Sequence, residues 1–221
     1  MPAKCYFALL LLFGFPLSSF AINVGSITTI LASDKELVGK VIKNESTMGR
    51  IVTVRVDRLD SPLAQGKIIP FETGGELLLA PSQLMMPGES KNIIKFWYQG
   101  KKDAQERYYR LTFTDEPINE DNSRTDGKSA VAQARATVST ILVVQPKQKK
   151  LDYAIVNGGV MNKGNVSFRI TAMGTCLANK KECRETFYVM PGRTYTLRQV
   201  NLKAKGTHLG LWDIDKYIPL Q

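Results

Sequence analysis

The stretch that most constrains how this chain can fold runs from Ser129 to Pro146, SAVAQARATVSTILVVQP. In its first half, small apolar residues alternate with mostly polar ones, which is the period of a strand with one apolar face. The apolar positions of that half are Ala130, Ala132, Ala134, Ala136 and Val138. The second half is a continuous apolar run from Ile141 to Val144, as in a strand buried on both faces. Pro146 ends the run, because proline cannot donate to a sheet ladder.

Fully extended, the stretch would span roughly 50 to 60 Å, which is long for one strand. Two interpretations stay open. It is an ordinary long strand of a β-sandwich, or it is a strand that also lends its apolar side chains to another protein.

The amino terminus has the features of an export signal. Lys4 is followed by an apolar core, Phe7 to Pro16, that is too short to span a bilayer. Ser19 and Ala21 are the small residues that a signal peptidase reads, so residues 1–21 are predicted to be removed by cleavage after Ala21. An uncleaved membrane anchor is the alternative.

Composition narrows the class of partner. The 221 residues carry a formal net charge of +10, with 43% hydrophobic and 23% charged residues, which is an ordinary globular composition. The basic residues are scattered through strand-like segments and form no basic helix or dense block, so we expect no nucleic-acid binding. Beyond the signal, no apolar run approaches the roughly 18 residues of a membrane helix, so we expect no stable membrane insertion.

Short strand signals recur along the mature chain without a long helical period, which is typical of an all-β sandwich. The clearest predicted strands of the first part are Ile22–Ile30, Val38–Ile42, Arg50–Leu59, Glu76–Ala80, Lys91–Tyr98 and Arg107–Phe113. Those of the second part are Tyr153–Val156, Val166–Met173, Arg184–Val189, Thr194–Leu197 and Gly210–Trp212. The polar, basic segment Gln145–Leu151 is the predicted linker, which gives domains at residues 22–146 and 152–221.

The remaining chemistry is sparse. Cys176 and Cys183 form an even pair in an exported chain, which predicts a disulfide that closes a short loop. His208 is the only histidine and has no ligand cluster or nucleophile motif near it in the sequence, so we predict a surface or turn position. No phosphate-binding loop is present. We therefore expect no catalytic residues, no metal and no cofactor.

The order of segments resembles a known family. LLLAPSQLMMPGESKNIIKFWY, ERYYRLTFTDEP, a polar loop, a long alternating strand ending in VVQP and a smaller β-domain follow one another. The chain looks like a periplasmic pilus-assembly chaperone of the chaperone–usher system, and it is similar in particular to the common-pilus (Ecp or Mat) fimbrial chaperones. The resemblance covers essentially the whole mature chain.

The resemblance implies two immunoglobulin-like β-sandwich domains in an L-shaped arrangement. It also implies a periplasmic chaperone that binds fimbrial subunits by donor-strand complementation and delivers them to the outer-membrane usher. The donor positions carried over from the family fall on Ala132, Ala134, Ala136 and Val138. Because exposed donor strands can pair with each other, a self-capping dimer is a further expectation.

One family feature does not carry over. Better-known relatives anchor the subunit's terminal carboxylate with an Arg and a Lys, at positions that match Thr28 and Ile141 here. Neither residue is basic. If an anchor exists, the candidates are Arg55, Arg58, Arg110 and Arg135, since arginine binds a carboxylate in a bidentate way.

Two other functions remain as alternatives. An exported structural pilus subunit or adhesin is the leading one, although its donor segment would be expected near the mature amino terminus. An exported hydrolase is a more distant alternative.

Overall fold

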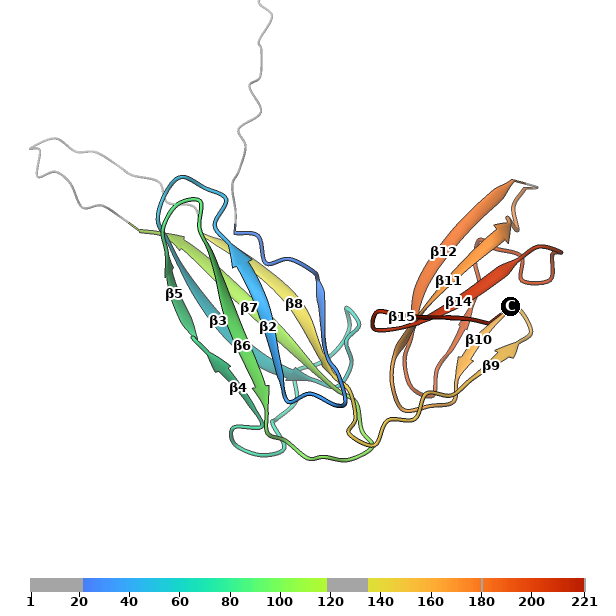
Figure 1. Cartoon of the computed structure of the whole chain (residues 1–221), viewed down its shortest axis with the longest axis horizontal. Coiled ribbons are helices and arrows are strands. Elements are labelled where there is room, and N and C mark those ends of the chain that lie inside the picture. Colours follow the sequence, from blue (N-terminus) through green and yellow to red (C-terminus); the bar gives the residue numbers. More distant parts are fainter. Residues whose placement is uncertain (1–21, 119–134, 180, 221) are drawn as a thin grey trace, which may run out of the picture.

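The computed structural model describes residues 22–118, 135–179 and 181–220. These residues form strands and no helix, arranged as two β-sandwiches (Figure 1). The all-β, two-sandwich prediction is confirmed. The predicted signal peptide and the donor positions Ala132 and Ala134 lie outside the described residues.

The first sandwich packs two sheets face to face. The larger sheet has the order β1-β8-β7-β3-β5 and the smaller one β2-β6-β4. The larger sheet is made of β1 (Thr28–Leu31), β8 (Ala136–Val144), β7 (Arg107–Pro117), β3 (Arg50–Leu59) and β5 (Gln83–Met86). The smaller sheet is made of β2 (Leu37–Lys43), β6 (Lys91–Tyr98) and β4 (Leu77–Ala80).

Alternation along the strands builds the first core. In β7, Tyr109, Leu111 and Phe113 are fully buried while the residues between them are partly exposed. Phe96 and Ile94 reach the same core from β6. Removal of these side chains from water holds the two sheets together.

The second sandwich has its own core, which includes Phe168, Ile170 and Leu211. One sheet has the order β13-β10-β9 and the other β12-β11-β14-β15. The first consists of β13 (Thr194–Thr196), β10 (Gly159–Asn162) and β9 (Tyr153–Val156). The second consists of β12 (Glu182–Val189), β11 (Phe168–Thr175), β14 (His208–Asp213) and β15 (Lys216–Pro219).

Some strands differ from the sequence prediction. The segment expected to be an edge strand, Ile22–Ile30, is divided: Asn23 forms an isolated bridge with Lys43, and β1 begins only at Thr28. Three short strands, β5, β10 and β15, were not predicted. Each is only four residues long and flanks turn or proline residues, so its periodicity is too brief to detect. His208 is exposed, but it begins a strand and does not lie in a turn.

Polar contacts join the two sandwiches at one end, from which they diverge (Figure 1). The Glu106 carboxylate, in the first sandwich, accepts a hydrogen bond from the Ser167 backbone N–H at 2.7 Å and another from its hydroxyl. In the linker, Lys149 Nζ lies 2.7 Å from both carboxylate oxygens of Asp213 and 3.3 Å from the Gln145 side-chain oxygen. Residues of both sandwiches line a cleft between them.

Candidate functional site

Strand β8 is fully paired on one side and half paired on the other. Its whole length, from Ala136 to Val144, lies antiparallel to β7. On the opposite side, β1 covers only Ile141–Val144, in parallel. Within the part of the chain that the structure describes, the edge of residues 136–140 away from β7 has no strand partner (Figure 1).

The hydrogen bonds to β1 show which backbone groups face this open edge. The Ile141 N–H donates to the carbonyl of Ile27 at 2.8 Å, and the Gln145 N–H donates to that of Leu31 at 3.0 Å. Backbone direction alternates along a strand, so the odd-numbered residues of β8 point away from β7. The N–H and C=O groups of Thr137 and Ser139 therefore point to the open edge.

The side chains alternate in the same way. Val138 packs against the first hydrophobic core, and Ala136 has the same parity and is partly buried. Thr137 and Ser139 point to the opposite face and are exposed. Ala136 and Val138, the two predicted donor positions that the structure describes, thus share the core-facing side of the strand, as the sequence alternation predicts.

The edge is open because the chain changes sheets just before β1. Asn23 exchanges two 2.8 Å backbone hydrogen bonds with Lys43 of β2, whereas Thr28 pairs with β8. The buried Lys40 ammonium holds this crossing: it donates to the carbonyl of Ser26 at 2.6 Å and to the Thr29 hydroxyl at 3.2 Å. Burial lowers the pKa of Lys40. Ile27, at the crossing, leaves 75% of its surface exposed beside the open edge.

A cleft of about 790 Å³ follows β8 toward the second sandwich. The outward side chains of β1 and β8 form one wall, including Thr28 and Ile141. The second sandwich supplies the other wall, and its basic residues there are Arg193 and Arg198. The cleft therefore has a mixed polar and apolar lining, and its basic side chains come from the second sandwich.

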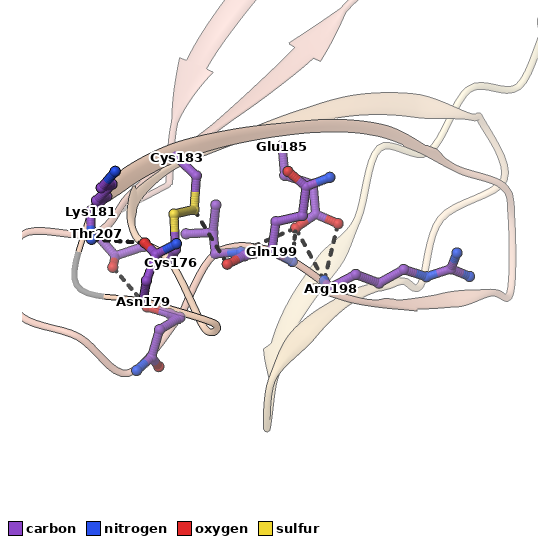
Figure 2. Close-up of a disulfide and its surroundings, with 10 residues drawn as sticks. Cys176, Asn179, Lys181, Cys183, Glu185, Arg198, Gln199 and Thr207 are labelled. Atoms are coloured by element: carbon purple, nitrogen blue, oxygen red, sulfur yellow. Dashed lines mark hydrogen bonds between the residues drawn. A yellow bond between two sulfur atoms is a disulfide. The ribbon is translucent and has the colours of Figure 1, made fainter.

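Backbone hydrogen bonds to Glu185 fix the position of Arg198. Its N–H is 3.1 Å from both Glu185 carboxylate oxygens, while the side chain extends away from that carboxylate (Figure 2). The guanidinium lies 5.9 Å from the centre of the Tyr195 ring, within cation–π range. Arg198 makes no ion pair with any residue in the described ranges.

The predicted carboxylate-anchor arginines are scattered. Arg55 pairs with Asp57 at 3.1 Å, and Arg135 pairs with Glu116 at 2.7 Å. Arg58 is buried and already bound to the carboxylates of Glu72 and Glu76.

Arg110 is the exception among these four arginines. It lies on the outer face of β7, where Ile141 is its cross-strand neighbour, and it forms no ion pair with a described residue. Sequence reasoning missed Arg193 and Arg198, whose only local signal is the Pro191-Gly192 turn before them. Their approach to β8 depends on the arrangement of the two sandwiches.

Other kinds of site find little support among the described residues. No group of His, Cys, Asp and Glu side chains there could hold a metal ion. The described residues form no helix that is long and apolar enough to cross a membrane. The predicted disulfide between Cys176 and Cys183 is present, with Cα atoms 5.4 Å apart (Figure 2).

Comparison with solved structures places the fold. The class 5 fimbriae chaperone CfaA matches with a TM-score of 0.56 at 14% identity, covering 90% of this chain and 98% of that one. A Salmonella enterica structure of SafA pilin in complex with the SafB chaperone matches with a TM-score of 0.53 at 13% identity, covering 87% and 89%. At such low identity these matches show a shared fold of two immunoglobulin-like sandwiches.

Sequence comparison places the family. Residues 151–220 match the family model described as the EcpB C-terminal domain. The Escherichia coli (strain K12) protein named "Probable fimbrial chaperone EcpB" is 39% identical over 203 residues, which is 91% of each chain. The same identity and coverage hold for the Shigella boydii serotype 4 protein of that name. The chain therefore belongs to the EcpB family of fimbrial chaperones, which are assembly proteins and not enzymes.

Proposed function

We propose that this chaperone works in the periplasm and binds an incomplete fimbrial subunit along the open edge of β8. The observation that carries the proposal is the half-paired strand: residues 136–140 have β7 on one side and no strand on the other. An exposed edge of this kind is a template for another strand. The SafA–SafB complex, a pilin held by a chaperone of the same fold, supports this choice of partner.

In this proposal the backbone and the side chains of β8 have separate roles. Thr137 and Ser139 supply the outward N–H and C=O groups that pair with a subunit strand. Ala136 and Val138, with Ala132 and Ala134 in the undescribed residues before them, place apolar side chains in the subunit's groove. Until a subunit binds, the same edge is able to pair with a second copy, so a self-capping dimer belongs to the proposal.

We further propose that a subunit carboxylate is anchored in the cleft by arginines of both sandwiches. Thr28 and Ile141 line the cleft but carry no charge. Arg110 lies on the neighbouring face of β7, and Arg193 and Arg198 reach the cleft from the second sandwich. Arg55, Arg58 and Arg135 already pair with carboxylates of this chain, which makes them weaker candidates.

Export and hand-over complete the proposal. Cleavage after Ala21 would release the mature chain into the periplasm, and the loaded chaperone would deliver its subunit to the outer-membrane usher. The predicted boundary, Gln145–Leu151, lies between the end of β8 and the start of β9, which supports two domains at residues 22–146 and 152–221.

The test removes the backbone N–H of Thr137, which points to the open edge. In Thr137→Pro, the ladder with β7 stays intact, because proline is tolerated where the N–H faces away from the sheet. One hydrogen bond to the subunit is lost, at about 1 kcal/mol, so capture of the pilin encoded in the same operon should weaken about fivefold. Co-purification from periplasm and a binding titration measure the change.

The matched control is Thr137→Ala, which removes the same side chain but keeps the N–H and should capture pilin normally. Both variants should unfold at the wild-type temperature. Pilin capture by Thr137→Pro at wild-type affinity would contradict strand addition at this edge.

A further inference from the structure

The outer face of the β2-β6-β4 sheet is apolar and exposed. Leu37, Trp97 and Leu78 are cross-strand neighbours and form one row across the three strands. Val41 and Ile93 form a second, parallel row. Trp97 is 49% exposed and Ile93 48%.

These exposed side chains do not pack in the chaperone's own hydrophobic core. Ile42, Ile94 and Phe96, the alternate residues of the same strands, are fully buried and already fill it. The solvent face of an antiparallel sheet is ordinarily polar. Two rows of exposed apolar side chains on such a face mark an interaction surface.

The face also carries positive charge at its centre. Lys95 lies between the two apolar rows, and its cross-strand neighbours are Gly39 and Ala80, which are too small to cover it. Lys43 and Lys91 face each other at one end. The outward positions of these three strands contain no acidic residue, and Lys95 forms no ion pair with a described residue.

We propose that this face binds a second protein partner, whose contact surface presents a carboxylate in the middle of an apolar patch. The charge of this face distinguishes between three kinds of partner. A second copy of the chaperone that bound through the same face would bring lysine side chains close to each other, and they would repel. A lipid surface would drive the central Lys95 into the apolar layer, whereas lipid-binding faces keep their cations at the rim. A protein with a central acid pairs with Lys95 while covering both rows, and Trp97 supplies an anchor of the kind that dominates interfaces.

The location allows two partners at once. The cleft is lined by the outer face of the opposite sheet, through β1 and β8. A subunit bound there leaves the β2-β6-β4 face free. The inference rests on the proposed function only in placing the second partner in fibre assembly, so the two are tested separately.

The first experiment uses the mature chaperone and a synthetic peptide with a central aspartate flanked by apolar residues. A matched peptide has lysine in place of the aspartate. The acidic peptide should shift the backbone amide resonances of β2, β6 and β4, and no others. Lys95→Glu should weaken its binding at least tenfold and should create binding of the lysine peptide. Lys205→Glu, an exposed lysine on the second sandwich, is the control and should change neither.

The second experiment follows fibres in cells. Lys95→Glu should reduce surface fibres at least tenfold while periplasmic pilin capture stays at the wild-type level. Loss of capture for Thr137→Pro but not for Lys95→Glu would separate the two sites. The proposal is overturned if neither peptide binds, if fibres assemble normally with Lys95→Glu, or if phosphatidylglycerol vesicles bind this face in place of the acidic peptide. It is equally overturned if Trp97→Ser abolishes a dimer of the free chaperone.

Discussion

Carboxylates that pair with buried arginines make the stability of the first sandwich depend on pH. The Glu72 carboxylate lies between Arg58 and Arg107, and the Arg107 guanidinium also binds Asp103 at 2.7 Å. The hydrogen bond from Arg107 lowers the pKa of Glu72 to about 2, aided by Arg58 and opposed by burial. The same guanidinium lowers the pKa of Asp103 to about 2. Both carboxylates stabilise the fold only while they are ionised.

The first prediction concerns Glu72→Gln. A depressed carboxylate pKa gives stability that is present above the unfolded pKa, near 4.5, and is lost as the pH falls toward 2. The variant should be about 2 kcal/mol less stable than wild type at pH 7, because two buried arginines lose a charged acceptor. The difference should shrink below pH 4. Urea unfolding at pH 7 and at pH 3 measures both values.

Glu182→Gln is the matched control, since Glu182 is an exposed carboxylate of the second sandwich with no side-chain partner among the described residues. It should leave the unfolding free energy unchanged at either pH. A Glu72→Gln variant that loses stability with falling pH as steeply as wild type would argue against this role of Glu72.

At the scale of elements, β11 and β12 form a hairpin closed by a covalent bond. Thr175 pairs with Glu182 at the hairpin's end, and the Cys176 N–H donates to the carbonyl of Lys181 at 2.8 Å. The disulfide joins residues 7 positions apart around the loop. It therefore reduces the conformational entropy of this hairpin in the unfolded state without changing how the folded strands pair.

The second prediction removes this bond with Cys176→Ser and Cys183→Ser together. A closed loop of this length contributes about 2 kcal/mol, so the free energy of unfolding of the second sandwich should fall by that amount and its urea midpoint should be lower. The first sandwich should be unaffected. Tyrosine and tryptophan fluorescence of the two parts during urea titration gives the comparison.

Reduced wild-type protein provides the internal check, since in excess thiol it should match the serine variant. Equal stability of oxidised wild type and variant would show that the disulfide does not stabilise the second sandwich.

At the scale of the whole molecule, the cleft requires both sandwiches. Glu106 and Ser167 join them through buried polar contacts, and burial raises the pKa of Glu106. In the linker, Lys149 pairs with Asp213 of the second sandwich and donates to the Gln145 side chain just after β8, which adds a second connection. These contacts hold Arg193 and Arg198 of the second sandwich opposite β1 and the half of β8 that pairs with it.

The third prediction tests that arrangement with Arg193→Gln and Arg198→Gln together. If the second sandwich anchors a subunit carboxylate, pilin capture should weaken at least tenfold, and more at low salt, where charge attraction is least screened. Both side chains are exposed, so thermal unfolding should not change. A titration of pilin at two salt concentrations measures the effect.

Arg184→Gln serves as control, because Arg184 is exposed on β12 and does not line the cleft. If the double variant binds pilin like wild type while Arg110→Gln does not, the anchor lies wholly within the first sandwich.

Much of the fold could be predicted from local patterns. The alternation in Arg50–Leu59 and Lys91–Tyr98 predicted β3 and β6 with their bounds, because each strand has one buried and one exposed face. The pair Cys176 and Cys183 predicted the disulfide. The parity of Ala136 and Val138 placed both on the core-facing side. Such features depend only on neighbours in the chain.

The sequence by itself thus determined most of the strands, the two-sandwich class and the parity of the long strand. Only the tertiary structure decided which half of β8 is open, since that depends on where residues 23–28 cross from β2 to β8. It also decided that Arg58 is neutralised by Glu72 and that Arg198 reaches the cleft. These outcomes follow from contacts between residues far apart in the chain, which no local period encodes.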